Sequence, residues 1–425
     1  MLLEFTVGNF RSFRERVTIS LQATGDDWLE EENIATVGSN RIIKAAAIYG
    51  ANAGGKSNFL VAMRKFRDLV KTSSKESQTG ERLPIDPFRL NTASESAPSF
   101  FEAIFVRNGT RYRYGFEASP ESIHSEWLFS QKDSTRETRL FTRADGVIDP
   151  SDAFKEGKGL EVRTRPNALF LSVAAQFNGE IAADILTWMN QFRNISGLED
   201  GLYMRFTAEK LNDPEYQHLI RDLVRAADTG INELKMVDMA EENFARLLPK
   251  EVPPEVRRRF RDMPEIGFSI KTYHRKFEAA HQPAGTVEFD LMKEGSAGTQ
   301  KFVSLTGPFL HTLKEGSILF VDEMEARLHP KLTQALVGLF NSSANTKGAQ
   351  LIFATHDQGL LNSRRIRRDQ VWFVEKDAYG ESRLYSLDEF KVRKEAKFEK
   401  EYLLGQFGGI PRLGDFQEVL THAAK

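Results

Sequence analysis

Two kinds of hydrophobic pattern alternate along the chain, and together they predict a mixed α/β protein. Alternating apolar and polar positions recur within residues 1–50, which is typical of half-buried strands. The segment 45–49 is instead uniformly apolar and predicts a strand that is buried on both faces. A helical spacing of apolar residues follows over 55–72.

The middle of the chain predicts a β-rich lobe and then a helical segment. Alternation is strong over 100–116, and Asn108-Gly109 separates two strand-like halves, which predicts a hairpin. More antiparallel strand is expected over 127–148. Residues 166–262 carry helical periodicity, for example at Ile185, Trp188, Met189 and Phe192, with a proline-rich break near residue 253.

The last third of the chain returns to short strands and helices. The predicted elements are a strand region (266–289), a helix (297–313) and four short strands (317–321, 351–354, 371–374 and 382–385). We therefore expect an α/β core that is split in sequence by an insertion of roughly 200 residues. The expected division is residues 1–72 for the first half of the core, 73–165 for a β-rich lobe, 166–265 for a helical insertion and 266–425 for the second half of the core.

Composition adds limits rather than a function. The chain has 425 residues, a formal net charge of −2 and no cysteine, so it has no global basic field, disulfide or thiol chemistry. The N-terminal residues lack a basic region followed by an apolar core, so we expect no signal peptide. No apolar run approaches the roughly 20 residues that span a bilayer. These features favour a cytoplasmic protein without a membrane segment.

The most specific motif is the glycine-rich stretch at residues 50–57, which fits Gly-x-x-x-x-Gly-Lys-Ser and lies between a predicted buried strand and a predicted helix. Gly54 and Gly55 let successive backbone N–H groups point at one centre, which suits a phosphate. The helix that follows adds its positive N-terminal end. Lys56 is expected to reach the β- and γ-phosphates, and Ser57 to hold Mg²⁺. The motif therefore predicts binding of a nucleoside triphosphate such as ATP.

Two acids end an apolar run in the last third of the chain. Asp322 and Glu323 directly follow the apolar residues 318–321. At the carboxyl end of a buried parallel strand, such side chains lie where ligands bind. We therefore expect Asp322 in the Mg²⁺ shell beside Ser57, and we expect Glu323 to polarise the attacking water.

The order of two further polar segments along the chain favours a functional role for them. His356 follows the apolar run 351–354 and could sense the γ-phosphate, although a lone His at a strand end is usually structural. Its position one strand after the acids favours the catalytic interpretation. Ser296, Gly298 and Gln300 precede a predicted helix, where Ser and Gly can bind phosphate or simply cap the helix.

This order of motifs resembles the ABC-type ATPases, and within them the SMC, RecF and OLD-like branch. Asn52 stands at the third position of the phosphate loop, and residues 9–13 are similar to the branch's N-terminal motif, whose Arg (here Arg11) lies near the nucleotide. The likeness looks closest to compact stand-alone ATPases of bacterial abortive-infection and phage-defence loci, such as the RloA/AbiL type and the PARIS ATPase. Residues 111–116, 126–128 and 369–373 carry that resemblance.

The resemblance implies a site shared between two chains. In such ATPases the signature segment of one subunit caps the ATP held by the phosphate loop of another, so Ser296, Gly298 and Gln300 would contact the γ-phosphate in trans. Two ATP molecules would be held in a head-to-tail dimer that opens after hydrolysis. The compact insertion and the lack of a nuclease pattern favour a defence ATPase that senses phage, with a phage protein as trigger, and that controls an effector encoded in the same operon.

The sequence departs from the family pattern in several places. A Gln normally lies between the phosphate-loop helix and the insertion, but none is assigned here, because segment 86–90 lacks one and Gln78 falls in a polar loop. Arg327 is bulky where family members are often small, and His329 replaces an Asp that is common in transporters. After residue 376 the chain lacks the Asp-x-Asp pattern of the OLD nuclease, so we expect no nuclease.

Two alternatives to a defence ATPase stay open. Basic clusters at 257–261 and 364–368 could bind DNA or RNA, as in a RecF- or SMC-like repair ATPase, although each is more typical of a solvated basic face. A nucleotide-binding subunit of a transporter is the third reading. The N-terminal motif and the long β-rich insertion argue against it.

Overall fold

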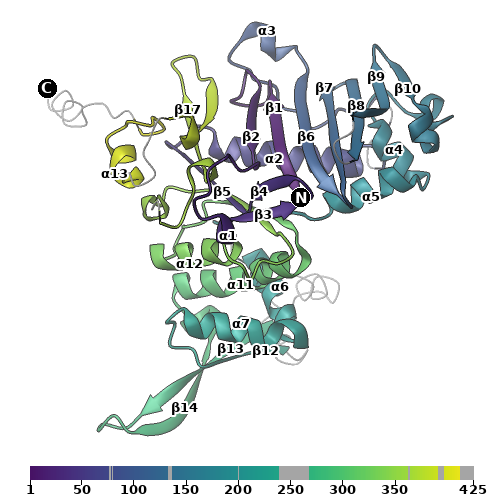
Figure 1. Cartoon of the computed structure of the whole chain (residues 1–425). Helices are drawn as coiled ribbons and strands as arrows, with labels where there is room; N and C mark the ends of the chain where they lie inside the picture. The colour runs from purple at the N-terminus through teal and green to yellow at the C-terminus, as the bar shows by residue number, and fades with distance from the viewer. Residues whose placement is uncertain are drawn as a thin grey trace, which may run out of the picture.

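The computed structural model describes residues 1–75, 78, 80–132, 136–199, 201–238, 268–361, 364–390 and 397–411. Two large sheets form an upper body, and helices with a small third sheet form an arm below it (Figure 1). This architecture confirms the predicted α/β class. Among the described residues no helix is long and apolar enough to cross a membrane.

A six-stranded sheet forms the centre of the split α/β core. Its order is β11-β15-β16-β5-β17-β18, with all neighbours parallel except the last pair. The strands are β5 (Ala45–Gly50), β11 (Phe192–Ser196), β15 (Ile318–Asp322), β16 (Gln350–Ala354), β17 (Val371–Lys376) and β18 (Ser382–Ser386). Strands from both ends of the chain therefore join in one sheet, as the split core requires.

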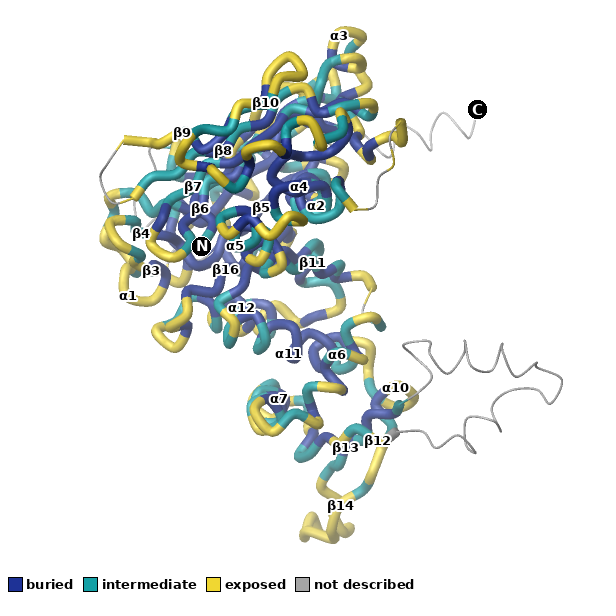
Figure 2. Tube along the Cα trace, turned by 90° about the vertical axis from the view of Figure 1, so that its right-hand side faces the viewer, coloured by how far each residue is buried: buried dark blue, intermediate teal, exposed yellow. Residues whose placement is uncertain are grey.

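Helices cover both faces of this sheet, which explains its uniformly apolar strands. On one face α2 (Lys56–Thr72) packs Phe59 and Phe66 into a core that contains Ile48 and Phe320. On the other face α11 (Ala297–Glu315) and α12 (Pro330–Phe340) share a second core with alternate strand residues such as Val321. Figure 2 shows the buried strands at the centre of the upper body.

The β-rich lobe is an antiparallel sheet of seven strands in the order β10-β9-β8-β7-β6-β1-β2. Its strands are β1 (Leu2–Gly8), β2 (Val17–Ser20), β6 (Ser99–Arg107), β7 (Thr110–Ala118), β8 (Ile123–Lys132), β9 (Thr138–Ala144) and β10 (Val147–Pro150). The hairpin predicted at Asn108-Gly109 is confirmed, with φ of 48° and 75° at these two residues. Strands β1 and β2 belong to the same sheet as the lobe, so the proposed domain boundary at residue 72 does not follow the sheets.

One part of the predicted helical segment is wrong. Helix α5 (Glu180–Met189) buries Ile185, Trp188 and Met189 as expected, but Phe192 begins strand β11. The spacing from Trp188 to Phe192 fits a helix, yet the chain leaves the helix at Asn190 and pairs with β15. The pairing partner lies far along the sequence, so local periodicity could not reveal it.

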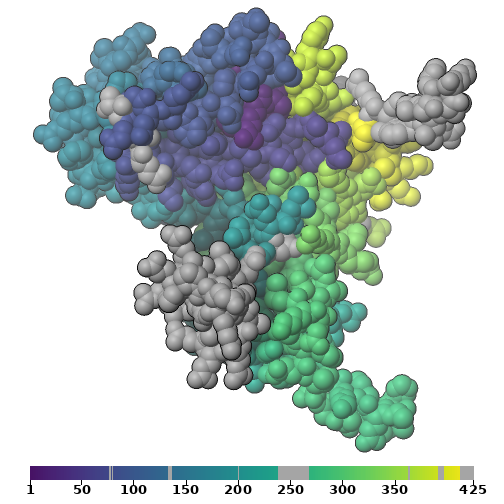
Figure 3. All heavy atoms as spheres, turned by 180° about the vertical axis from the view of Figure 1, so that it is seen from behind, coloured from purple at the N-terminus to yellow at the C-terminus, as the bar shows by residue number. Residues whose placement is uncertain are grey.

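The arm below the core combines part of the helical insertion with β13 (Phe268–Phe277) and β14 (Pro283–Asp290), which were expected in the second half of the core. Helices α6 (Gly201–Leu211) and α7 (Pro214–Ala226) pack against α11, and a sheet of β12 (Glu233–Asp238), β13 and β14 extends beyond them. The tip of this sheet stands clear of the molecule in Figures 1 and 3. The remaining elements are α1 (Glu30–Asn33), β3 (Ile34–Val37), β4 (Asn40–Ile43), α3 (Thr92–Glu95), η1 (Asp152–Gly157), η2 (Glu161–Arg163), α4 (Phe170–Gln176), α10 (Leu291–Glu294), η3 (Gln358–Leu360), η4 (Arg368–Gln370), η5 (Leu387–Glu389) and α13 (Phe398–Leu403).

Candidate functional site

The phosphate loop joins β5 to α2 at the carboxyl edge of the central sheet. Ala53 has φ of 60° and Gly55 has φ of 123°, so the loop curls back on itself before the helix begins. A Cβ atom at Gly55 would lie 2.6 Å from Ser382 Oγ. Glycine is therefore required there by packing as well as by conformation. The loop and the N-terminus of a 17-residue helix form the concave, positive end that suits a phosphate.

Neighbouring segments hold this loop in place. Ser382 Oγ donates to the carbonyl oxygen of Gly54 over 2.6 Å, and Ser382 N donates to the carbonyl oxygen of Ser12 over 2.7 Å. Asn58, in the first turn of α2, donates from Nδ2 to Ser12 Oγ over 2.9 Å. The N-terminal turn and strand β18 thus brace the phosphate loop from the same side.

Arg11 lies against the first turn of α2, and its predicted place near the nucleotide stays a prediction. Its guanidinium pairs with Asp86 over 3.2 Å and contacts Asn58 Oδ1 over 3.4 Å, and its side chain is 36% exposed. Segment 86–90, where a family Gln was sought, therefore lies against the N-terminal turn. Asn52 is exposed at the tip of the loop.

Lys56 and His356, which are 300 positions apart in sequence, meet beside the phosphate loop. Lys56 Nζ donates to the carbonyl oxygen of Gly50 over 2.8 Å and lies 2.9 Å from His356 Nε2. Because an ammonium group only donates, Nε2 is the acceptor and the proton of the neutral ring is on Nδ1. Burial lowers the pKa of both groups. The charge of Lys56 lowers the pKa of His356 further, whereas the nearby acid Asp322 opposes the lowering of the Lys56 pKa.

The acids occupy the edge of the sheet next to the loop. Asp322 ends β15 and lines a pocket of about 270 Å³ together with Ser57. Its Oδ1 atom is buried and has no hydrogen-bond partner among the described residues. An unpaired carboxylate oxygen beside a hydroxyl group fits a divalent cation that takes oxygen ligands. No cluster of three or more His, Asp or Glu in the described part of the chain could hold a metal ion by itself, so water and phosphate oxygens would complete the shell of a bound cation.

Glu323 follows in the left-handed conformation, with φ of 50°. Gly197, just after β11, is pressed against it: Gly197 N donates to the carbonyl oxygen of Asp322 over 2.7 Å, and a Cβ atom at Gly197 would lie 2.1 Å from the Glu323 carbonyl oxygen. The backbone of the acid pair is thus fixed by the end of the edge strand. This contact restrains the backbone position from which the Glu323 side chain extends.

Sequence reasoning missed two residues in this region. Asn194 of β11 lines the same pocket as Ser57 and Asp322, and both polar atoms of its side chain are buried without a partner in the described structure. The feature of the sequence that could have indicated Asn194 is a polar residue inside a short strand. The interpretation of 166–262 as helical left this strand unrecognised. Glu325 accepts a hydrogen bond from the backbone N–H of His356, a contact that no motif announces.

The signature segment lies on a different surface. Ser296 caps α11 by accepting from Thr299 N over 3.1 Å and is exposed. Gln300 uses its amide group within its own chain, where Nε2 donates to the carbonyl oxygens of Leu291, Met292 and Gly295 over 2.9–3.2 Å. Gln300 therefore fastens α10 to the start of α11, and its predicted contact with a phosphate stays a prediction.

An open pocket of about 690 Å³ surrounds this segment. Ser296 and Gly298 line it with three basic side chains that follow the acids in sequence, namely Arg327 in the loop, His329 at the N-cap of α12 and Lys331 in its first turn. Helices α11 and α12 both begin beside this pocket, so their N-termini add partial positive charge to it. No residue lines both this pocket and the one that contains Ser57 and Asp322. The signature segment and the pocket beside the phosphate loop thus lie on separate surfaces of the described chain.

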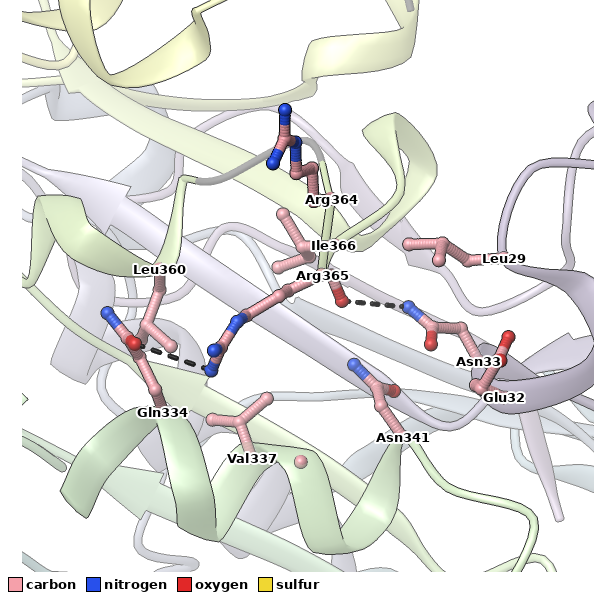
Figure 4. A pocket seen from close by; sticks show the side chains of 11 residues that line it. Leu29, Glu32, Asn33, Gln334, Val337, Asn341, Leu360, Arg364, Arg365 and Ile366 are labelled. Carbon is pink, nitrogen blue, oxygen red and sulfur yellow. Dashed lines mark hydrogen bonds between the residues drawn. The ribbon is translucent and has the colours of Figure 1, made fainter. Parts of the chain in front are cut away.

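The basic cluster at 364–368 is divided by the fold. Arg367 is buried and pairs with Asp369 over 2.7 Å, and Arg368 pairs with acids over 3.3–3.5 Å, so this half serves the chain's own packing rather than nucleic acid. Arg364 and Arg365 line a pocket of about 280 Å³ on the flank of α12 (Figure 4), and Arg365 Nη1 lies 3.4 Å from Gln334 Oε1. None of the residues lining it belongs to the phosphate loop, the acid pair or the signature segment. The cluster at 257–261 lies outside the described residues.

Comparison with known proteins identifies the family. Residues 45–362 match the family described as "AAA domain, putative AbiEii toxin, Type IV TA system". No curated protein sequence matches the chain. Solved structures similar to it include the SMC head domain from Thermotoga maritima (13% identity, 91% of this chain and 98% of that chain covered, TM-score 0.39) and RecF bound to ATP (14%, 90% and 97%, 0.29). Because the family match spans well over half of its length, the chain belongs to this family of AAA domain ATPases.

Proposed function

We propose that this protein is an ATP-gated dimer switch, in which two chains meet head to tail and enclose two ATP molecules. The observation that carries the proposal is the separation of two complementary surfaces on one chain. One holds Ser57 and Asp322, and the other holds Ser296 and Gly298 among basic side chains and helix N-termini. No residue of the phosphate loop or the acid pair lines the second surface in the described part of the chain, and its charge suits the γ-phosphate bound by another copy.

ATP fits the residues at the first surface. The phosphate loop would hold the β- and γ-phosphates, with Gly54 and Gly55 supplying backbone donors and Lys56 exchanging its contact with His356 for a phosphate oxygen. Asn52, at the exposed tip of the loop, and Arg11, beside it, would border the nucleotide. Ser57 and Asp322 would hold Mg²⁺, which neutralises charge on the phosphates when it is bound.

Glu323 and His356 are the proposed catalytic residues. Glu323 would polarise the attacking water, and its fixed backbone keeps the carboxylate at the edge of the sheet beside Asp322. His356 Nε2 accepts a hydrogen bond from Lys56 in this structure. When Lys56 turns to the phosphate, Nε2 would be able to accept a hydrogen bond from another donor, such as the attacking water. Loss of the γ-phosphate would remove the contact shared by both chains and let the dimer open.

We further propose that this switch serves anti-phage defence by controlling an effector encoded beside it. The family description names a toxin of a toxin–antitoxin system, and this supports a role in which one chain regulates a toxic partner. The likeness of its motifs to phage-defence ATPases supports the same role. An infection trigger would act by shifting the ATP-dependent equilibrium between the open and closed dimer.

Expression with and without the neighbouring gene tests this role. The proposal predicts that the purified neighbour product binds the ATPase and that protection from phage requires both genes and an intact Lys56. Protection by the ATPase gene alone would overturn effector control. Hydrolysis that rises several-fold with DNA would instead favour the RecF-like alternative.

A further inference from the structure

A buried lysine lies beside the site, and the proposed mechanism of ATP hydrolysis does not use it. Lys301 lies in α11, one position after Gln300, and its side chain is completely buried. Its Nζ donates to the backbone carbonyl oxygen of Gly197. Lysine is almost never fully buried unless its ammonium group is paired or hydrogen-bonded, and the contact with Gly197 ties the helix that carries the signature segment to the end of β11.

The atom that Lys301 contacts is next to the catalytic acids. Gly197 N donates to the Asp322 carbonyl oxygen over 2.7 Å, so Gly197 is bonded on both sides of its backbone, to Lys301 and to the acid pair. A Cβ atom at Gly197 would lie 2.1 Å from the Glu323 carbonyl oxygen, which shows how little space separates the two backbones. A shift of Gly197 therefore displaces Glu323.

A second contact binds the same helix to the same edge strand. His311 of α11 lies with Nε2 2.8 Å from Arg193 Nη2 in β11 and with Nδ1 2.9 Å from Tyr216 OH in α7. The start of the signature helix also touches the loop after the acids, since a Cβ atom at Gly298 would lie 2.8 Å from the Arg327 carbonyl oxygen. Helix α11 thus contacts β11 at Arg193 and contacts the residue after this strand, Gly197, through Lys301.

We propose that Lys301 is a positioning residue that couples the signature segment to Glu323 of its own chain. The inference rests on the proposed dimer, because there Ser296 would meet the ATP held by the other copy. Engagement of that ATP would set the position of α11, and Lys301 would pass this position through Gly197 to Glu323. Each ATP site would then act on the other, and for binding this coupling is reciprocal.

The variant Lys301→Met tests the coupling because it keeps the length of the side chain and removes its charge. We expect it to bind ATP with the wild-type Kd and to dimerise with ATP, while kcat falls about 100-fold, the scale of a 1 Å misplacement in an active site. The Hill coefficient for ATP should fall toward one. Lys314→Met is the matched control on the same helix, because Lys314 pairs with the exposed Glu215 over 3.0 Å, and kcat should stay within twofold.

Results that differ from this expectation for Lys301→Met also decide whether Lys301 couples the two sites. A kcat of Lys301→Met within twofold of wild type overturns the proposal, and so does joint loss of ATP-driven dimerisation and hydrolysis, which would place the effect in the signature helix alone. If Lys301→Met fails to fold, Lys301→Arg decides, since it keeps a donor: near-normal kcat and cooperativity support the coupling, and a 100-fold loss overturns it. If the unmodified protein hydrolyses ATP without forming a dimer, the proposed function is refuted independently of Lys301. Light scattering with ATP measures whether the dimer forms.

Discussion

Replacing Gly197 with Ala is expected to slow hydrolysis without weakening ATP binding. The added Cβ would lie 2.1 Å from the carbonyl oxygen of Glu323 and 2.6 Å from that of Asp322. Since a Cβ atom is essentially never found closer than 3.0 Å to another atom, the backbone of the acid pair must move by about 1 Å. A misplacement of that size costs about 100-fold in rate. In free energy this raises the barrier by about 2.7 kcal/mol. The phosphate loop does not include Gly197, so the Kd for ATP should stay within about threefold of wild type.

Steady-state phosphate release at saturating ATP, together with the Kd of a fluorescent ATP analogue, measures both quantities. Gly338→Ala is the matched control, because no atom lies within 4 Å of the added Cβ and Gly338 lies within helix α12. This control should hydrolyse ATP normally and gain roughly 0.5–1 kcal/mol of stability. Wild-type kcat in a folded Gly197→Ala protein would show that Glu323 is not held by this contact or does not act in hydrolysis.

Three further predictions address the loop, the helix contacts and the brace. Lys56→Ala should weaken ATP binding by about 10- to 100-fold, because it removes charge-assisted bonds to phosphate, and calorimetric titration with ATP measures this. Burial and then Arg193 lower the pKa of His311 to about 4, so the unfolded chain protonates near pH 6.5 before the folded chain does. Stability should be full above pH 6.5 and fall by roughly 1–2 kcal/mol toward pH 4 after discounting for solvent screening, and urea midpoints of wild type and His311→Gln would show whether the loss depends on His311. Ser382→Ala should weaken ATP binding a few-fold, because it removes the 2.6 Å bond to the Gly54 carbonyl oxygen, and an unchanged Kd would refute its role as a brace.

The parts of the fold that were predicted are those whose signal is local. The runs at 45–49 and 318–321 are buried on both faces and flanked by polar residues, so β5 and β15 were predicted from the sequence. The phosphate loop needs a fixed spacing of glycine and lysine within eight residues, which makes it visible without a structure. The hairpin at Asn108-Gly109 is visible for the same reason.

The parts that were missed depend on contacts between distant segments. Strand β11 exists because it pairs with β15, while its own residues continue the helical spacing of α5. The placement of Asn194 follows from that pairing. Gln300 shows the opposite case, since its motif predicts a phosphate contact while its amide group already binds three carbonyl oxygens of its own chain. Such competition between a local motif and tertiary contacts is settled only by the fold.

Light scattering of Glu323→Gln with ATP and Mg²⁺ tests the central claim most directly. The substitution keeps the shape of the side chain and removes the proposed base, so ATP should bind but not be hydrolysed. The account predicts a stable dimer of twice the chain mass with ATP, a monomer with ADP, and a monomer for the double variant Glu323→Gln/Ser296→Arg, which blocks the signature surface. A Glu323→Gln protein that stays monomeric with ATP, or that hydrolyses it at the wild-type rate, would contradict the account.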